Sequence, residues 1–143
     1  MTTPDIFCQM IAGQAEVESV LRTATSIAFL DHRPVFKGHV LVCPLEHVED
    51  LAGLPADSVA GFFSDVQRVA AALPEALGCQ GTFVAINNQV SQSVPHLHAH
   101  VVPRTRGDGL RGFFRPRHAY AEGQLVEYAD RIRSALTLHH GQP

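Results

Sequence analysis

The sequence predicts an α+β domain with a mostly antiparallel sheet, and three observations support this class. Short β-branched runs bounded by glycine or proline lie on both sides of residues 57–73, whose apolar side chains are spaced by three and four as in an amphipathic helix. Strands and helices do not alternate regularly, as a parallel βαβ sheet would require. With 143 residues, 45% of them hydrophobic, the chain is long enough for one domain with a substantial core. We therefore expect a single domain over residues 1–143.

The expected elements follow in chain order. The first half predicts a short helix over 6–13 stopped by Gly13, a hairpin with strands near 20–23 and 26–30 closed by Pro34, and a buried strand over 38–44. The second half predicts one long helix over 57–73 ended by Pro74, strands over 82–87 and 96–102, and a helical tail marked by Leu125, Tyr128, Ile132 and Leu136.

Composition and charge exclude several classes of protein. The formal net charge is −3 and no helix-turn-helix, zinc-finger or RNA-binding motif is present, so no nucleic-acid partner is expected. The N-terminus carries Asp5 and no cationic stretch before an apolar run, and no apolar run reaches the roughly 18 residues that cross a bilayer, so we expect neither a secretory signal nor membrane association. Three scattered cysteines, Cys8, Cys43 and Cys79, make no disulfide framework. These features predict a cytoplasmic protein.

The segment SVPHLHAHVVPR, residues 93–104, places a histidine at every second position of an apolar run. In a strand His96, His98 and His100 would share one face, about 7 Å apart from one to the next, while their apolar spacers pack into the core. Three histidines so far apart do not reach one zinc ion without bending of the strand. A chance cluster between two prolines is improbable. The pattern favours catalysis, in which one imidazole attacks and its neighbours fix its tautomer and neutralise charge.

The run His96-Leu97-His98-Ala99-His100-Val101-Val102 resembles the signature of the histidine triad (HIT) family of nucleotide hydrolases and transferases. Three further blocks resemble other parts of that family, in its order and at nearly its spacing: DIFCQMIAG, AFLDHRPVFKGHVLVCPLEHVEDL and INNQVSQSVPH. The resemblance implies a HIT-like fold with a core over about residues 5–117, followed by a helical extension over 118–143. It also implies a homodimer with the sheets joined across a two-fold axis, in which one of Phe62 and Phe63 faces the partner or both are buried.

The same resemblance implies a chemistry for each triad position. His98 matches the nucleophile, which attacks the α-phosphorus of a nucleotide and forms a nucleotidyl-histidine that water or another acceptor resolves. His100 matches a donor to phosphate oxygens near the leaving group, and His96 matches a support behind the site. This chemistry needs positioned donors and a neutral imidazole and no cofactor.

Substrate contacts are implied as well. Asp31 matches the ribose anchor, with His32 at the rim of the base pocket, although a turn-capping carboxylate is the alternative for Asp31. Phe7, Met10 and Leu41 match the apolar walls around a purine, and plain core packing is the alternative for these three. The donors to the phosphates match Gln92, Ser93 and either Asn87 or Asn88. The loop before the triad is shorter than in many relatives and lacks glycine, which leaves the choice of asparagine open.

The resemblance extends to a structural zinc site held by some bacterial relatives. Here Asp5 stands where their first cysteine would be, and Asp5, Cys8, His47 and His96 form a four-ligand candidate. The alternative is a free buried Cys8 and a surface Asp5.

Five arginines fall within fourteen residues near the C-terminal side of the triad, against one acid, Asp108: Arg104, Arg106, Arg111, Arg115 and Arg117. A solvated basic loop is one interpretation; the other is that Arg104 and its neighbours meet the distal phosphates of a long substrate. The arginines and Gln92 favour a dinucleoside polyphosphate hydrolase acting on a purine nucleotide. A nucleoside phosphoramidate hydrolase, a non-catalytic nucleotide-binding module and a zinc metallohydrolase remain as alternatives.

Overall fold

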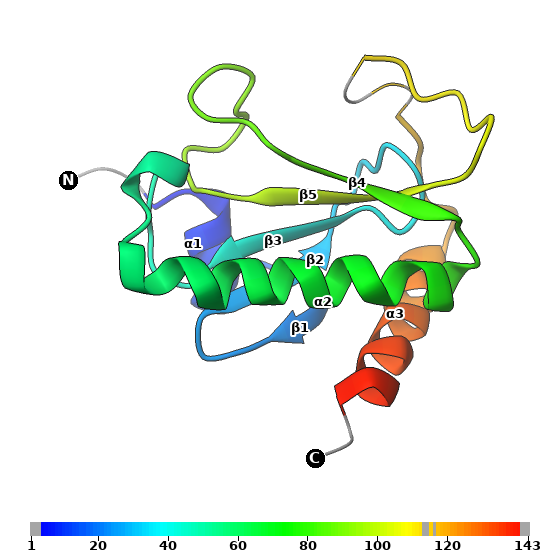
Figure 1. Cartoon of the computed structure of the whole chain (residues 1–143), viewed down its shortest axis with the longest axis horizontal. Coiled ribbons are helices and arrows are strands. Elements are labelled where there is room, and N and C mark those ends of the chain that lie inside the picture. Colours follow the sequence, from blue (N-terminus) through cyan, green and yellow to red (C-terminus); the bar gives the residue numbers. More distant parts are fainter. Residues whose placement is uncertain (1–3, 113–114, 116, 141–143) are drawn as a thin grey trace.

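A computed structural model describes residues 4–112, 115 and 117–140, without the side chains of the last two (Figure 1). Its centre is a five-stranded antiparallel sheet in the order β1-β2-β3-β5-β4. The strands are β1 (Ser19–Arg22), β2 (Ser26–Leu30), β3 (Val40–Pro44), β4 (Gly81–Ile86) and β5 (Ala99–Arg104). The helices are α1 (Ile6–Ile11), α2 (Val59–Leu77) and α3 (Gln124–His140), with two short 3-10 turns at Leu51–Gly53 and Ala56–Ser58. The predicted α+β class is confirmed.

One face of the sheet carries the main core. Helix α2 lies across this face, with α3 beside it near one end (Figure 1). Because side chains alternate along a strand, every second residue of the central strands points toward α2. The buried core on this side contains Ala28, Leu30, Val40, Val42, Leu97, Ala99 and Val101 from the sheet side, Phe62, Val69 and Leu73 from α2, and Ala129, Ile132 and Leu136 from α3. Helix α3 therefore belongs to the same core as the sheet.

The opposite face of the sheet is covered by α1 and carries a smaller apolar cluster. Its buried members are Phe7, Ile27, Phe29, Leu41 and Cys43, with Met10 and Val94 packed against them. The side chain of Asp5 caps α1 by accepting a hydrogen bond from the Cys8 N–H at 2.8 Å. This face, between α1 and the start of β5, is where the site residues gather.

Most predicted strand and helix boundaries differ from the structure by one or two residues, and two differ by more. Helix α2 does not end at Pro74 but continues to Leu77 and ends at Gly78, whose left-handed φ of 71° allows its N–H to donate to the Pro74 carbonyl at 2.8 Å. Proline lacks the N–H that would donate to the carbonyl four residues earlier, yet the chain keeps its helical course for three residues beyond Pro74, so the expected stop was placed too early. Strand β5 begins at Ala99 rather than at His96, because its ladder with β3 and β4 starts there.

No helix in the described ranges is both long enough and apolar enough to pass through a membrane.

Candidate active site

The three histidines of the triad point to the α1 face of the sheet although only His100 lies within β5. The backbone before the strand keeps the alternation, since Leu97 belongs to the main core on the other side. The side chains of His96, His98 and His100 are buried, with 0%, 3% and 7% of their surfaces exposed. The ring of Phe7 packs edge-on against His98, 5.0 Å between centroids. A helix side chain therefore holds the middle imidazole from one side.

The tautomer of His98 follows from its hydrogen bond. Its Nδ1 lies 2.8 Å from the carbonyl oxygen of His96. A carbonyl only accepts, so Nδ1 carries the ring proton and donates it to this bond. The lone pair of His98 is consequently on Nε2. Burial, the larger influence, lowers the pKa of His98, which keeps the ring neutral and the lone pair available at pH 7.

His100 is fixed by a second buried histidine, His39. The backbone N–H of Val35 donates to His39 Nδ1 at 3.1 Å, so the proton of His39 is on Nε2. That Nε2 lies 2.9 Å from Nδ1 of His100 and donates to it, which leaves the His100 proton on Nε2. Burial, His98 and Arg117 together lower the pKa of His100 to about 3, and burial lowers the pKa of His39 well below its ordinary value. The pair is therefore neutral and ordered, with His100 as a donor.

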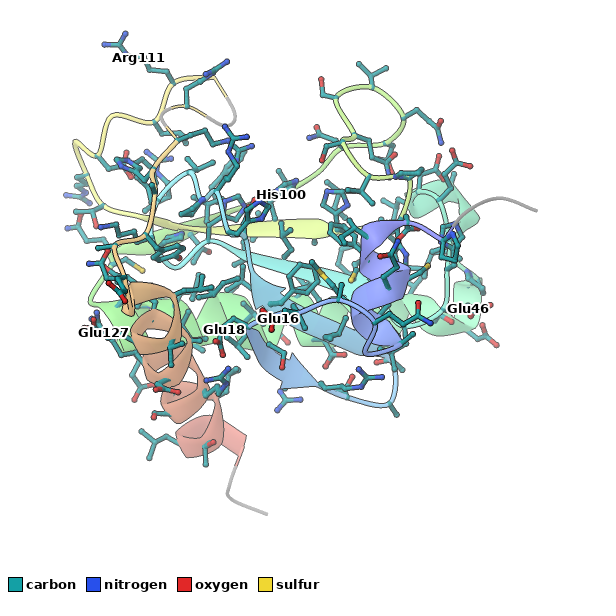
Figure 2. The ribbon with its side chains drawn as sticks, turned by 180° about the vertical axis from the view of Figure 1, so that it is seen from behind. Glu16, Glu18, Glu46, His100, Arg111 and Glu127 are labelled. Carbon is teal, nitrogen blue, oxygen red and sulfur yellow. The ribbon has the colours of Figure 1, made fainter. Side chains whose placement is uncertain are left out.

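A cavity of about 630 Å³ opens over these rings. Polar groups on its wall include His98, His100, Asp31, His32 and Ser93, together with Arg117. The remainder is mostly apolar and comes largely from α1 and the sheet: Ile6, Phe7, Met10, Val17, Phe29, Leu30, Leu41, Val94 and Leu125. This size and lining are typical of small-ligand sites. One end of the cavity is therefore mostly apolar, although Glu16 and Glu18 also line it, and the other carries the nucleophilic ring, Asp31 and Arg117 (Figure 2).

Asp31 lies at the polar end of this cavity, directly after β2. Its Oδ1 accepts from the Arg33 N–H at 2.9 Å, and its Oδ2 lies 3.5 Å from Nη1 of Arg117. Asp31 therefore caps the turn and also lies on the cavity wall, so the turn-capping role does not conflict with the predicted ribose contact.

The four residues of the candidate zinc site converge at the other end of the histidine run. Cys8 Sγ lies 3.3 Å from Nδ1 of His47 and 3.5 Å from Nδ1 of His96. The carboxylate of Asp5 lies 3.0 Å from the same nitrogen of His47 and 3.4 Å from that of His96. All four ligand atoms lie within 4.8 Å of one another. The Nε2 of His96 faces the Pro44 carbonyl at 2.9 Å, so its Nδ1 presents a lone pair to the cluster.

Several predicted contacts do not reach the cavity. Gln92 bonds within its own loop, donating to the Glu49 carbonyl at 2.6 Å and accepting from the Gln89 N–H at 2.8 Å. Asn88 accepts from the Leu51 N–H at 2.8 Å, and Asn87 is half-buried outside the cavity lining. The loop lacks glycine, and Gln89 and Ser91 take the positive φ values, 68° and 61°, that glycine usually supplies. In this loop conformation the side-chain amides of Asn88 and Gln92 bond to neighbouring backbone groups and do not face the cavity.

Arg104 is also held elsewhere. It ends β5, and its guanidinium forms two hydrogen bonds with Asp108, at 2.7 and 3.1 Å. It does not line the cavity. The arginine that reaches the cavity is Arg117, because the chain returns to the sheet where the His118 N–H donates to the Pro34 carbonyl at 2.8 Å.

His39 was not predicted as a site residue, and Arg117 was predicted only as one of the arginines clustered near Arg104. The spacing of either residue from the triad gives no local signal. Only the strand register, in which Leu41 pairs with His100, brings the start of β3 beside the triad.

Comparison with known proteins finds similar sequences and structures. The sequence profile of the HIT domain matches residues 3–107. The chain is 30% identical to adenosine 5'-monophosphoramidase hnt1 of Schizosaccharomyces pombe over 133 residues, covering 92% of this chain and 97% of that protein. It is 33% identical over 89 residues to the asymmetrical bis(5'-nucleosyl)-tetraphosphatase of the same yeast, covering 61% of this chain and 49% of that protein.

Among solved structures, a zinc-bound histidine triad family protein from Mycobacterium smegmatis superposes with a TM-score of 0.83 at 34% identity. The match covers 95% of each chain.

Proposed function

The chain belongs to the HIT domain family, and from this premise we propose that it is a nucleotide hydrolase or nucleotidyl transferase that forms a covalent bond to His98. The observation that carries the proposal is the His98–His96 carbonyl hydrogen bond, which leaves Nε2 of a neutral ring as the free nucleophile at a cavity wall. A neutral imidazole is a good nucleophile near pH 7 and a good leaving group from phosphorus.

The reaction proceeds in two displacements at the α-phosphorus. In the first, the Nε2 lone pair of His98 forms a P–N bond while the bond to the leaving oxygen breaks, and that oxygen departs with the electron pair as a phosphate anion. In the second, a water oxygen attacks the same phosphorus, the P–N bond returns its electrons to Nε2, and the water proton passes to solvent. Nε2–H of His100 donates to the phosphate oxygens, where negative charge develops. The apolar end of the cavity accepts the purine, and Asp31 accepts from the ribose hydroxyls.

We propose dinucleoside polyphosphates as the substrates, with nucleoside phosphoramidates as the alternative, since relatives with each activity are known. The support is the arginine-bearing polar end of the cavity. Rates on diadenosine tetraphosphate and on an adenosine phosphoramidate, measured side by side, test it. We expect a higher kcat/KM on the tetraphosphate; a clear preference for the phosphoramidate would reverse the assignment. Absence of turnover on either, with nucleotide binding retained, would point to the non-catalytic module.

We also propose that Asp5, Cys8, His47 and His96 hold a structural zinc ion. The donor set fits: two imidazole nitrogens, a thiol and a carboxylate, 3.0–3.5 Å apart in the pairs described above, close to the about 3.3–3.8 Å edges of a tetrahedron with zinc bond lengths. Burial and the charge of Asp5 raise the pKa of the Cys8 thiol, so thiolate there needs a cation. Bound zinc would neutralise these groups and tie α1 to the segment before β5; bond cleavage does not require it.

Elemental analysis after metal-replete purification should give about one zinc per chain, and Cys8→Ala should lower it strongly. Cys79→Ala is the matched control, because Cys79 lies outside the cluster. Zinc at about 1,000 times its Kd would add about 4 kcal/mol to the free energy of unfolding, visible as a higher Tm. Less than a tenth of a zinc per wild-type chain would dismiss the site. Chelator-sensitive Tm with chelator-insensitive catalysis would exclude the metallohydrolase alternative.

A homodimer through β4 is the third part of the proposal. Within the described residues β4 is an edge strand with one side unpaired, and Val84 on it is 44% exposed. On α2, Phe62 is 1% exposed and Phe63 37%, so one of the two aromatic rings is available to a partner. Sedimentation should give twice the chain mass for the wild type and a monomer for Val84→Lys. A monomeric wild type at micromolar concentration would refute the dimer.

We also propose a cytoplasmic location, because three free cysteines are typical of a reducing compartment.

A further inference from the structure

A second hollow adjoins the main cavity and has a different chemistry. Its volume is about 490 Å³, and it is lined by Asp31, His32, Arg33, Ser93, Arg115 and Arg117. Asp31, His32, Ser93 and Arg117 line both spaces, so the two are continuous along this wall. Unlike the main cavity, the hollow has no apolar side chain among the described residues of its lining. A ligand that extends from one into the other would have an apolar part and a strongly polar part.

The hollow carries cationic groups whose charge is not neutralised within the protein. Among the residues the structure describes, the guanidinium groups of Arg33 and Arg115 have no hydrogen bond or ion pair. By contrast, Arg104 is paired with Asp108 and Arg133 with Glu18. Arg117 is held in place at the boundary, with Nη1 donating to the Arg33 carbonyl at 2.8 Å. Asp31 is the only acid among the lining residues that the structure describes, so the hollow attracts anions.

The charges are also ordered along the cavity. Glu16 and Glu18 line the end of the main cavity that is mostly apolar. In Figure 2 these two acids lie on one side of His100 and Arg111 lies on the other, where nitrogen-bearing side chains gather. A nucleotide bound at His98 would thus place its uncharged nucleoside toward the acidic end and its phosphates toward the arginines. The opposite orientation would set phosphate against the carboxylate of Glu16, since Glu18 is paired with Arg133.

We propose that this hollow, whose free cations are Arg33 and Arg115, is a subsite for the leaving group, and that it selects substrates with at least two phosphates beyond the one attacked. This inference rests on the proposed function and narrows its substrate class. For a dinucleoside tetraphosphate the departing group is a nucleoside triphosphate, whose phosphates match guanidinium donors in charge and geometry. An amine leaving group from a phosphoramidate has no phosphate and gains nothing there.

The test uses Arg33→Gln and the Arg33→Gln/Arg115→Gln double variant in the full chain. On diadenosine tetraphosphate at low salt we expect kcat/KM to fall about 10-fold for the single and up to about 100-fold for the double variant, with a weaker salt dependence than the wild type. On adenosine phosphoramidate both should stay within about twofold of the wild type. Arg104→Gln is the matched control, since it removes the same charge from a residue outside both spaces and should change neither rate.

An unchanged rate on the tetraphosphate, or equal losses on both substrates, would overturn the subsite. In either case His98-dependent turnover of the phosphoramidate would leave the proposed function standing. If the wild type turned over neither substrate, the proposed function and this inference would fall together.

Discussion

Replacement of His98 by alanine is expected to lower kcat on either substrate class by about 10,000-fold or more. The reason is that both displacements make or break a bond to one atom, Nε2 of His98, and no other group takes over this bond to phosphorus. The His96 carbonyl and Phe7 that now hold the ring would remain, so the cavity should persist. The measurement is single-turnover hydrolysis with quantitation of released nucleoside monophosphate.

Two controls separate lost chemistry from lost folding in this variant. Thermal denaturation should show a folded protein, and calorimetric titration should show that adenosine monophosphate still binds within about 10-fold of the wild type. Residual kcat within a factor of ten of the wild type, in a folded protein, would show that His98 is not the nucleophile.

The second large effect is expected at His39, which touches no substrate. We expect His39→Leu to reduce kcat by about 100- to 1,000-fold, because His100 would lose the donor that keeps its proton on Nε2. Loss of the correct imidazole tautomer costs up to about 10,000-fold where a carboxylate plays this role. The leucine also leaves the Val35 N–H without its acceptor, so the free energy of unfolding should fall by about 1–3 kcal/mol.

A conservative variant distinguishes positioning from plain stability at this residue. The amide nitrogen of glutamine falls near the place of histidine Nε2 and can donate to His100, so His39→Gln should recover at least about a tenth of wild-type kcat. We expect Tm to fall in both variants while kcat separates them. If the two variants lost activity equally, in proportion to their loss of stability, the role of His39 in fixing His100 would be refuted.

The period-two pattern of the sequence accounts for most of the site that could be predicted. Leu97 and Ala99 pack into the main core, which sends His98 and His100 to the other face, as alternation requires. The apolar residues expected around the base also line the cavity. Leu41 does so by the same strand alternation, and Phe7 and Met10 do so because residues three apart share one face of helix α1. The convergence of Asp5 with His47 came from family resemblance, since residues so far apart in sequence carry no local signal of contact.

The positions of the remaining site residues depend on tertiary contacts that the spacing of residues in the sequence does not show. Among five clustered arginines, Arg104 is captured by Asp108 four residues later, while Arg117 reaches the cavity only because the chain returns beside Pro34. Gln92 bonds away from the cavity for a similar reason: its side chain donates to the Glu49 carbonyl. Such choices among equivalent side chains are settled by tertiary packing and not by sequence pattern.

Rapid-quench mass spectrometry during turnover of diadenosine tetraphosphate tests the central claim most directly. We expect a fraction of the intact chains to gain the mass of one nucleoside monophosphate minus one water. Peptide fragmentation should place this added mass on His98. We also expect the adduct to disappear as the substrate is exhausted and never to form in the His98→Ala variant. A wild-type enzyme that turns over with no adduct at any quench time, or with the nucleotide on another side chain, would contradict it.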